Sequence, residues 1–227
     1  MRTISKLLVC LLFGTMVLPL AVFAKEESKS GFVRLANAVA VGTGKLTMEV
    51  DGREVNQKGY QPGDVTGGIS LSPGSHTVRF SRPGTKEGST RVKVLPDDTT
   101  ILIPFAQRVP ASDGEPAHWA IMILRLKQND PEHDRSATFV SVSQTPEIRV
   151  EMRGPDGGWS PVFVKWLALT RSIIHHPRGY VPLKTSDGNL VSIPVASKGN
   201  YVVLLYDDER GNVRSLNFRD RKFLSAD

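Results

Sequence analysis

Residues Ile69 to Phe80, with the sequence ISLSPGSHTVRF, give the clearest indication of the fold. Ile69-Ser-Leu71 alternates apolar and polar side chains, and so does Ser75-His-Thr-Val-Arg-Phe80. Between them, Ser72-Pro73-Gly74 is a turn signal, because proline presets φ and glycine accepts a left-handed conformation. Alternation places successive side chains on opposite faces of a strand. The stretch therefore predicts a strand, a tight turn and a returning strand with one buried face.

The same pattern continues through the first half of the chain. Lys45-Leu-Thr-Met-Glu-Val50 alternates, and Asp51-Gly52 after it is a two-residue hairpin signal because both positions tolerate positive φ. Thr90-Arg-Val-Lys-Val94 places its basic residues on one strand face and its valines on the other. Thr99-Thr-Ile-Leu-Ile-Pro-Phe105 is a further strand. Short strands separated by turns predict sheets that each bury one face against another sheet.

Two segments leave the element type open. Trp119-Ala-Ile-Met-Ile-Leu-Arg-Leu126 is very apolar, and a central strand is favoured over a short buried helix because turn-rich segments flank it. Val162 to Thr170 fits either a strand or one or two turns of helix. Farther on, Tyr180 to Leu183 and Leu190 to Ile193 are typical of two strands joined by a turn.

The pattern of the second half of the chain repeats that of the first. Three pairs of segments match in order: Phe32–Asn37 with Phe139–Gln144, Leu46–Gly52 with Ile148–Gly154, and Thr99–Phe105 with Gly199–Tyr206. We therefore predict an internal duplication. Two unrelated sandwiches would show similar alternation, and that alternative stays open.

The predicted fold class is all-β, with two tandem small antiparallel β-sandwich (immunoglobulin-like) domains after a cleaved signal peptide. The polar, proline-broken stretch QNDPEHDRS predicts a linker between them. The expected organisation is a signal peptide at 1–24, a polar leader at 25–30, a first sandwich at 31–127, a linker at 128–136 and a second sandwich at 137–227.

The first residues are typical of a secretory signal peptide. Arg2 and Lys6 form a basic start, Leu7 to Leu20 is largely apolar, and Val22-Phe-Ala24 suits a signal peptidase. An uncleaved anchor is the alternative, but the apolar stretch is short for a span and contains Pro19. We expect a periplasmic protein, with release outside the cell as the alternative, and no membrane span after cleavage.

Composition narrows the chemistry. Cys10 is the only cysteine and lies in the leader, so the mature chain is expected to have no disulfides, thiol nucleophiles or cysteine metal sites. The net charge of +6 falls to +4 when Arg2 and Lys6 are removed. Scattered basic residues indicate a solvated face, or a weak surface for an anionic polysaccharide or acidic headgroup. Nucleic acid is not an expected partner, since no basic stripe is interleaved with aromatics.

Histidines provide two candidate metal sites. His175 and His176 would point to opposite faces if they lay on a strand, and Pro177 after them favours a solvated loop. The second candidate is His133, whose acidic neighbours are Asp130, Glu132 and Asp134. It lacks the spacing of a calcium loop, so a solvated linker is favoured.

Other candidates are better explained by structure. Asp207-Asp208-Glu209 fits turn chemistry better than paired-carboxylate catalysis. Gly63 to Gly68 lacks the strand-to-helix context of a phosphate loop, and no Gly-x-Ser-x-Gly elbow occurs. Four aromatic residues could form a sugar-stacking platform, although packing is favoured for them: Trp159, Trp166, Tyr180 and Tyr201. We therefore expect no catalytic, cofactor-binding or metal-binding residues.

Phe32-Val-Arg-Leu-Ala-Asn-Ala38, Leu71-Ser-Pro-Gly-Ser-His-Thr-Val-Arg79 and Ala137-Thr-Phe-Val-Ser-Val-Ser143, in that order, resemble the AlgF-like family of periplasmic alginate O-acetylation proteins. The resemblance covers both halves and implies a signal peptide followed by two small β-sandwich domains. It also implies an adaptor that binds other export-machinery components, with acetyl transfer done elsewhere. The chain departs from the family pattern around Ile173 to Tyr180.

The expected function is that of a non-enzymatic periplasmic adaptor or accessory protein of an exopolysaccharide O-acetylation or export assembly. Its partners would be other periplasmic or envelope proteins and an anionic polysaccharide, bound through sheet edges and loops. The alternative is a secreted carbohydrate-binding β-sandwich module that uses aromatics near Trp159 and Trp166. A hydrolase with an unrecognised site is the third hypothesis.

Overall fold

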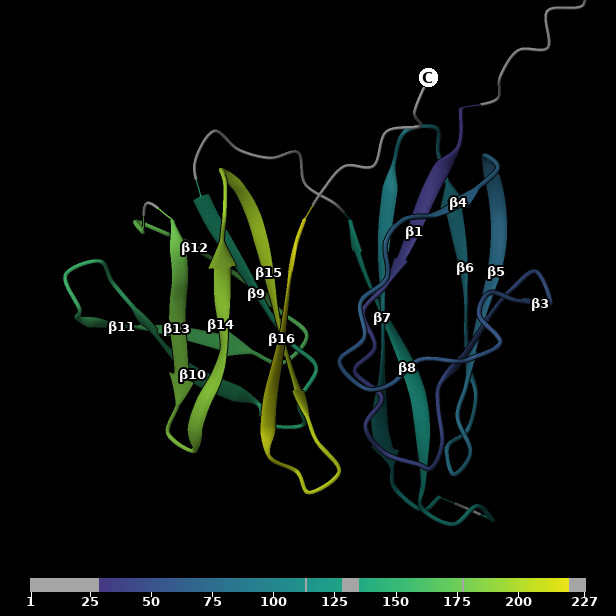
Figure 1. The fold of residues 1–227 in the computed structure, drawn as a ribbon. Helices are drawn as coiled ribbons and strands as arrows, with labels where there is room; N and C mark the ends of the chain where they lie inside the picture. Colours follow the sequence, from purple (N-terminus) through teal and green to yellow (C-terminus); the bar gives the residue numbers. More distant parts are fainter. Residues whose placement is uncertain (1–28, 113, 128–134, 177, 221–227) are drawn as a thin grey trace, which may run out of the picture.

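The computed structural model describes residues 29–112, 114–127, 135–176 and 178–220 (Figure 1). The predicted signal peptide, most of the polar leader and the acidic segment around His133 lie outside these residues. The described residues consist of strands, turns and irregular segments, which confirms the all-β prediction. None of them forms a helix long and apolar enough to cross a membrane.

Eight strands make up the first half: β1 (Gly31–Leu35), β2 (Thr47–Val50), β3 (Arg53–Glu54), β4 (Ile69–Leu71), β5 (Gly74–Ser81), β6 (Gly88–Val94), β7 (Thr99–Val109) and β8 (His118–Lys127). Eight more make up the second: β9 (Arg135–Ser141), β10 (Glu147–Arg153), β11 (Trp159–Lys165), β12 (Leu169–Ile173), β13 (Gly179–Thr185), β14 (Gly188–Val195), β15 (Gly199–Asp207) and β16 (Val213–Arg219).

Each half is a sandwich of two four-stranded sheets. In the first half, the sheet β4-β1-β7-β8 packs against the sheet β3-β2-β5-β6, and Leu35, Met48 and Phe80 lie in the core between them. In the second half, the sheet β12-β9-β15-β16 packs against β11-β10-β13-β14 around Phe139 and Tyr201. The prediction of two β-sandwiches is confirmed.

The two sandwiches have the same strand order. Adding eight to every strand number of the first half reproduces both sheets of the second. This shared topology is the arrangement that an internal duplication would produce, and the duplication itself stays a prediction. The register differs from the sequence match, however. Leu35 pairs with Leu102, and the equivalent core pair in the second half is Phe139 with Val203, so Leu35 rather than Phe32 corresponds to Phe139.

One pair of strands in each half is parallel, namely β1 with β7 and β9 with β15. The other ladders between named strands of the described chain are antiparallel, as expected. β7 and β15 are buried on both faces over most of their length, because each lies in a sheet that is covered on both sides. This explains the nearly unbroken apolar runs in Ile101–Phe105 and Tyr201–Leu205.

The second cover of each inner sheet is the other sandwich (Figure 1). The sheet containing β1, β7 and β8 packs against the sheet containing β9, β15 and β16, so the chain forms four stacked layers. We call this contact the seam. Its core is apolar and consists of Ala36, Ala38, Ile101, Ile103, Phe105, Leu126, Val140, Val142, Val202, Leu204, Leu216 and Phe218.

The seam also contains a buried cation. Arg34 is 6% exposed, and its Nη1 donates a hydrogen bond across the seam to the carbonyl oxygen of Arg219 at 3.0 Å. Its guanidinium lies 5.0 Å from the ring centroid of Phe218. A buried charge needs such partners, because desolvation is costly without them.

Several local predictions can now be compared with the structure. Asp51 and Gly52 both have positive φ in the β2–β3 turn, as predicted. The segment 119–126 lies within strand β8, and 162–170 is divided between β11 and β12. The prediction that residues 75–80 return beside 69–71 was wrong, since β4 and β5 belong to different sheets and the proline turn crosses between the layers. β9 begins at Arg135, so the last two residues of the expected linker 128–136 belong to a strand.

Candidate functional site

A groove follows the seam where the carboxyl ends of β7 and β15 lie side by side. Its central cavity of about 150 Å³ adjoins a cavity of about 200 Å³ through Phe105, Val142 and Gln144. On the other side it adjoins a cavity of about 340 Å³ through Ala40 and Tyr206. Shared lining residues make the three cavities one groove, which we call the seam groove.

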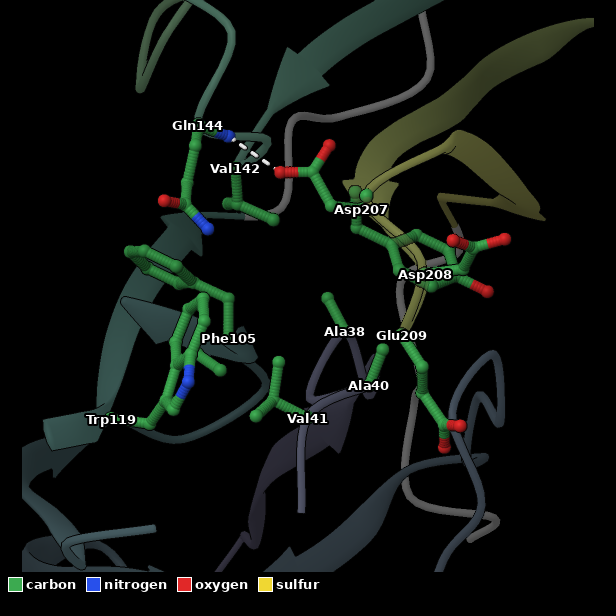
Figure 2. A pocket seen from close by; sticks show the side chains of 13 residues that line it. Ala38, Ala40, Val41, Phe105, Trp119, Val142, Gln144, Asp207, Asp208 and Glu209 are labelled. Atoms are coloured by element: carbon green, nitrogen blue, oxygen red, sulfur yellow. Dashed lines mark hydrogen bonds between the residues drawn. The ribbon is translucent and has the colours of Figure 1, made fainter. Parts of the chain in front are cut away.

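Aromatic and amide side chains line the seam groove on one side. Phe105 and Trp119 lie next to each other, with the side chain of Gln144 above them (Figure 2). Trp166 and Gln107 extend this lining into the next cavity. Aromatic faces and amides are groups that can bind sugars or extended peptides.

The opposite side of the groove carries Asp207, Asp208 and Glu209 (Figure 2). Asp207 accepts hydrogen bonds from the Ser143 hydroxyl at 2.6 Å and from the Gln144 backbone N–H at 2.7 Å. Asp207 therefore holds the segment after β9 against β15, which is a structural role.

Asp208 organises the β15–β16 turn. Its burial raises the pKa, but hydrogen bonds from Asn212, Arg214 and Arg210 outweigh that effect and lower the pKa to about 2. The Arg214 Nε lies 2.9 Å from Oδ2 of Asp208. A carboxylate with so low a pKa is ionised at neutral pH and cannot serve as a general acid there. The preferred sequence interpretation, turn chemistry, agrees with this geometry.

Glu209 makes a charge contact across the seam. Its carboxylate lies 3.9 Å from Nη2 of Arg82, a residue of the first half that is 5% exposed. Burial lowers the pKa of the Arg82 guanidinium, and the Glu209 carboxylate partly offsets that effect. Arg82 also donates to the carbonyl oxygens of Val39 and Gly42. The acidic turn therefore contributes a contact between the two halves.

A second candidate surface begins at Trp166, at the end of the seam groove. Trp166 is 41% exposed, Leu167 39%, Leu169 55% and Ile173 58%. Leu169, Arg171 and Ile173 alternate along β12, so they share one face of this strand. β12 is at the edge of its sheet, with only β9 as a ladder partner among the described strands. We call Trp166, Leu167, Leu169 and Ile173 the β12 edge surface.

The backbone of β12 also points outward at Leu169 and Ile173. The N–H of Ile174 donates to the carbonyl oxygen of Arg135, which makes 174 a position whose backbone faces β9. Hydrogen-bonded positions alternate in an antiparallel ladder, so the N–H and C=O groups of Leu169 and Ile173 face away from β9. Such an edge can accept another strand.

A basic cavity of about 370 Å³ adjoins the far end of β12. Its floor is apolar and includes the buried residues Met152, Ile174 and Val181. Among the described residues, those of its lining that are charged or ionisable are Arg153, Arg171, His175 and His176. The structure thus brings both candidate histidines to one cavity. The described residues contain no group of three or more His, Cys, Asp or Glu placed to hold a metal ion.

The aromatic candidates do not form a single platform. Tyr201 is buried, and its hydroxyl donates to the carbonyl oxygen of Ser197 at 2.9 Å. Lys184 Nζ lies 4.3 Å from the ring centroid of Trp159, so a cation already occupies that ring. Tyr180 is 73% exposed, on β13. Trp166 belongs instead to the seam groove and the β12 edge surface.

The glycine-rich segment 63–68 forms part of a loop between β3 and β4. The Gly63 N–H donates to the Asn37 carbonyl oxygen, and the Asp64 carboxylate accepts the Gln61 N–H at 2.6 Å. The first contact holds the loop against the segment after β1, and the second lies within the loop itself. These contacts give the loop a structural role.

Comparisons of the chain with protein-family models and with curated proteins give no match. The functional interpretation therefore depends on the surfaces themselves. Sequence reasoning missed the seam groove, whose lining comes from segments far apart in the chain. The sequence did contain one signal for it. The apolar runs at 101–105 and 201–205 are nearly unbroken, and such runs indicate strands whose sheets are covered on both faces.

Proposed function

We propose that this protein is a non-enzymatic periplasmic adaptor or accessory protein that binds other proteins of an exopolysaccharide O-acetylation or export assembly of the alginate type. The observation that carries the binding role is the β12 edge surface, where Leu169 and Ile173 are more than half exposed on an edge strand. Exposed apolar side chains beside unpaired backbone groups favour addition of a partner strand. The periplasmic location and the type of assembly are supported by the leader sequence and by the motif resemblance.

Crosslinking in cells tests this proposal. A photo-crosslinking amino acid at position 169 should capture envelope proteins of a polysaccharide-modifying assembly. The same amino acid at position 191 is the matched control, because Val191 is 57% exposed but lies on β14, in the other sheet. In the chain with the crosslinker at 169, Ile173→Glu should abolish the capture, since a charge would then have to be desolvated in the interface.

Three results would count against the adaptor proposal. They are no captured protein at position 169, the same proteins captured at 169 and 191, or capture of a second copy of this chain alone. Circular dichroism of the purified Ile173→Glu variant should match the parent, which separates loss of binding from loss of folding.

The second candidate function is carbohydrate binding in the seam groove. Phe105, Trp119 and Trp166 along the groove, with Gln107 and Gln144, favour it. Tryptophan fluorescence titrated with neutral and uronate-containing oligosaccharides should then change in a saturable way. The change should persist in Trp159→Phe, which lies outside the groove, and disappear in Trp119→Ala. A flat response to the whole panel would eliminate this candidate.

A further inference from the structure

The turn between β11 and β12 holds a leucine in an unfavourable backbone conformation. Leu167 has a φ of 53°, and the other described non-glycine residues with positive φ are Asp51 and Asp97. Aspartate tolerates the left-handed region because its short polar side chain can hydrogen-bond locally, whereas leucine has no such compensation. The chain therefore keeps an apolar side chain at Leu167, where glycine or asparagine would be less strained.

Backbone hydrogen bonds fix this turn in place. The N–H of Trp166 donates to the carbonyl oxygen of Pro146 at 2.9 Å, and the N–H of Leu167 donates to that of Ser141 at 2.8 Å. The exposed side chains of Trp166 and Leu167 are therefore presented on a rigid backbone. A preorganised surface loses little conformational entropy when it binds.

The first half builds the equivalent connection differently. Residues 55–68 between β3 and β4 place Tyr60 in the core, and none of their apolar side chains is exposed. In the second half the connection is only Trp166, Leu167 and Ala168, and its two large side chains are 41% and 39% exposed. The shared strand order does not require these exposed side chains, which favours a binding role for them.

A cavity of about 200 Å³ lies beside this turn, and we call it the Trp166 cavity. Its apolar lining residues are Phe105, Ala106, Val142 and Trp166. Its polar lining residues are Gln107, Arg108 and Gln144. The Arg108 guanidinium lies 5.9 Å from the ring centroid of Trp119, so this cation already contacts an aromatic ring. The cavity therefore offers apolar walls to a side chain and amide groups to a backbone.

The free edge of β12 leads to this cavity. β12 begins at Leu169, three residues after Trp166. The outward N–H and C=O groups of Leu169 and Ile173 can pair with an added strand. A polypeptide that pairs with them and continues past Leu169 therefore reaches the Trp166 cavity within a few residues.

We propose that an extended apolar segment of a partner protein adds to the free edge of β12, packs over Leu167 and places one large apolar side chain in the Trp166 cavity. This inference rests on the proposed adaptor function and names the chemistry of the partner segment. The outward backbone groups of β12 select a polypeptide, because neither a hydrocarbon chain nor a glycan can continue the ladder of a sheet. The apolar walls of the cavity select an apolar side chain, since a charged one would have to be desolvated there.

Selection from a displayed library of twelve-residue peptides on the full mature protein tests the inference. We expect enriched peptides to share one large apolar residue, the anchor that enters the Trp166 cavity, next to a stretch of β-branched or aromatic residues. The affinity of the best peptide should fall at least tenfold on Leu167→Asn, because a polar side chain replaces the apolar contact. It should also fall at least tenfold on Gln107→Trp, whose added ring would fill the cavity.

Leu95→Asn is the matched control, because Leu95 is 43% exposed, lies in the first half and does not have positive φ. The peptide should bind this variant as it binds the parent. Asparagine tolerates the left-handed region, so Leu167→Asn should lower the midpoint of urea unfolding less than Leu95→Asn does. A larger decrease for Leu167→Asn would mean that packing within the chain requires this leucine, and would overturn its assignment to the interface.

Amide hydrogen exchange locates the bound peptide. Exchange at Leu169 and Ile173 should slow when the peptide binds, because their outward N–H groups become hydrogen-bonded. Peptides that protect β12 but bind Leu167→Asn and Gln107→Trp as tightly as the parent would overturn the inference and leave the adaptor proposal standing. Peptides that require an acidic residue at the anchor position would have the same consequence. Failure to select any peptide at β12 would overturn both.

A membrane surface and a second copy of this chain are the rival occupants. Flotation of the mature protein with vesicles of phosphatidylglycerol and phosphatidylethanolamine, lost in Leu167→Asn, would overturn the inference in favour of lipid. A concentration-dependent dimer in sedimentation that is lost in the same variant would make a second copy the occupant. We expect neither result for the parent protein.

Discussion

The two halves of this protein share a strand order, but the edge strands of their inner sheets face their apolar side chains in different directions. β4 and β12 hold the same place in their sheets. In β4, Ile69 and Leu71 pair with Val33 and Gly31 and pack against the core of the first sandwich. In β12, the residues on the core-facing side are Thr170 and Ser172, opposite Phe139 and Ala137, whereas the apolar residues face outward.

Relative to the neighbouring strand, the alternating apolar positions of β12 are displaced by one residue from those of β4. Because side chains alternate between faces, such a shift moves every apolar side chain from the core to the surface. Among the described residues, exposed large hydrophobic side chains number two in the first half, Leu95 and Met122, and eight in the second. This asymmetry is the reason why our adaptor proposal places partner binding on the second half.

The largest expected effect tests whether the seam is as essential as the two cores. Ile103 on β7 and Leu204 on β15 hold equivalent positions, and both are fully buried in the seam. Ile103→Ala and Leu204→Ala should each lower the free energy of unfolding by about 2–5 kcal/mol, as for large-to-small changes in a core. Urea unfolding followed by circular dichroism and by tryptophan fluorescence should give coincident single transitions. Two separate transitions, or a loss below about 1 kcal/mol, would show that the sandwiches are energetically independent.

An intermediate effect tests whether the apolar side chains face the core in β4 and the surface in β12. Ile69→Thr in β4 should lower the free energy of unfolding by about 1–2 kcal/mol, because Ile69 packs against the core. The same substitution in β12, Ile173→Thr, should change it by no more than about 0.5 kcal/mol, since Ile173 is 58% exposed. Chemical denaturation of both variants measures the two values. Equal losses would contradict the account of β12 as a surface strand.

The smallest expected effect concerns a charged contact that belongs to the first half. Nδ1 of His76 lies 2.7 Å from Oδ2 of Asp51, and its Nε2 lies 2.8 Å from the carbonyl oxygen of Ser72. Hydrogen bonds to Asp51 and Ser72 raise the pKa of His76 above 6.5. Hydrogen bonds from the backbone of Thr77 and from His76 lower the pKa of Asp51 below 3.8. The corresponding turn of the second half, between β10 and β11, is held by Asp156 instead.

The sign of the pH dependence follows from these directions. The contribution of His76 is fully present below about pH 6.5 and is lost as the pH rises through its folded-state pKa. The contribution of Asp51 is present above about pH 3.8 and is lost as the pH falls. His76→Gln should therefore destabilise the protein more at pH 5.5 than at pH 9 in urea unfolding. An equal loss at both pH values would mean that the imidazolium adds nothing.

Much of the fold could be predicted from local sequence. Alternation predicted the strand faces correctly in β6, where Arg91 and Lys93 are exposed and Val92 and Val94 are buried. The Asp51-Gly52 signal predicted a hairpin because the positive φ requirement is local. The Ser72-Pro73-Gly74 turn was misjudged for the opposite reason: its conformation is local, but whether the next strand returns or crosses to another sheet depends on distant partners.

The candidate surfaces were less predictable. His175 and His176 were recognised, but their grouping with Arg153 and Arg171 depends on how β10 and β12 end at the same side of the sandwich. The exposure of the Leu169 and Ile173 side chains could not be predicted either, because a strand of alternating residues does not reveal which of its faces is covered. That information lies in the pairing of β12 with β9.

The sequence by itself determined the all-β class, the positions of most strands and turns, and the polar and apolar faces of individual strands, since these depend on neighbouring residues and on the two-residue period of extended backbone. Only the tertiary structure decided that the two sandwiches share an apolar seam, that a groove and a basic cavity adjoin β12, and that its apolar side chains point outward. Those features arise from pairings that local patterns do not record: contacts between the two halves for the seam, and the placement of β9, β10 and β12 for the cavity and the outward face.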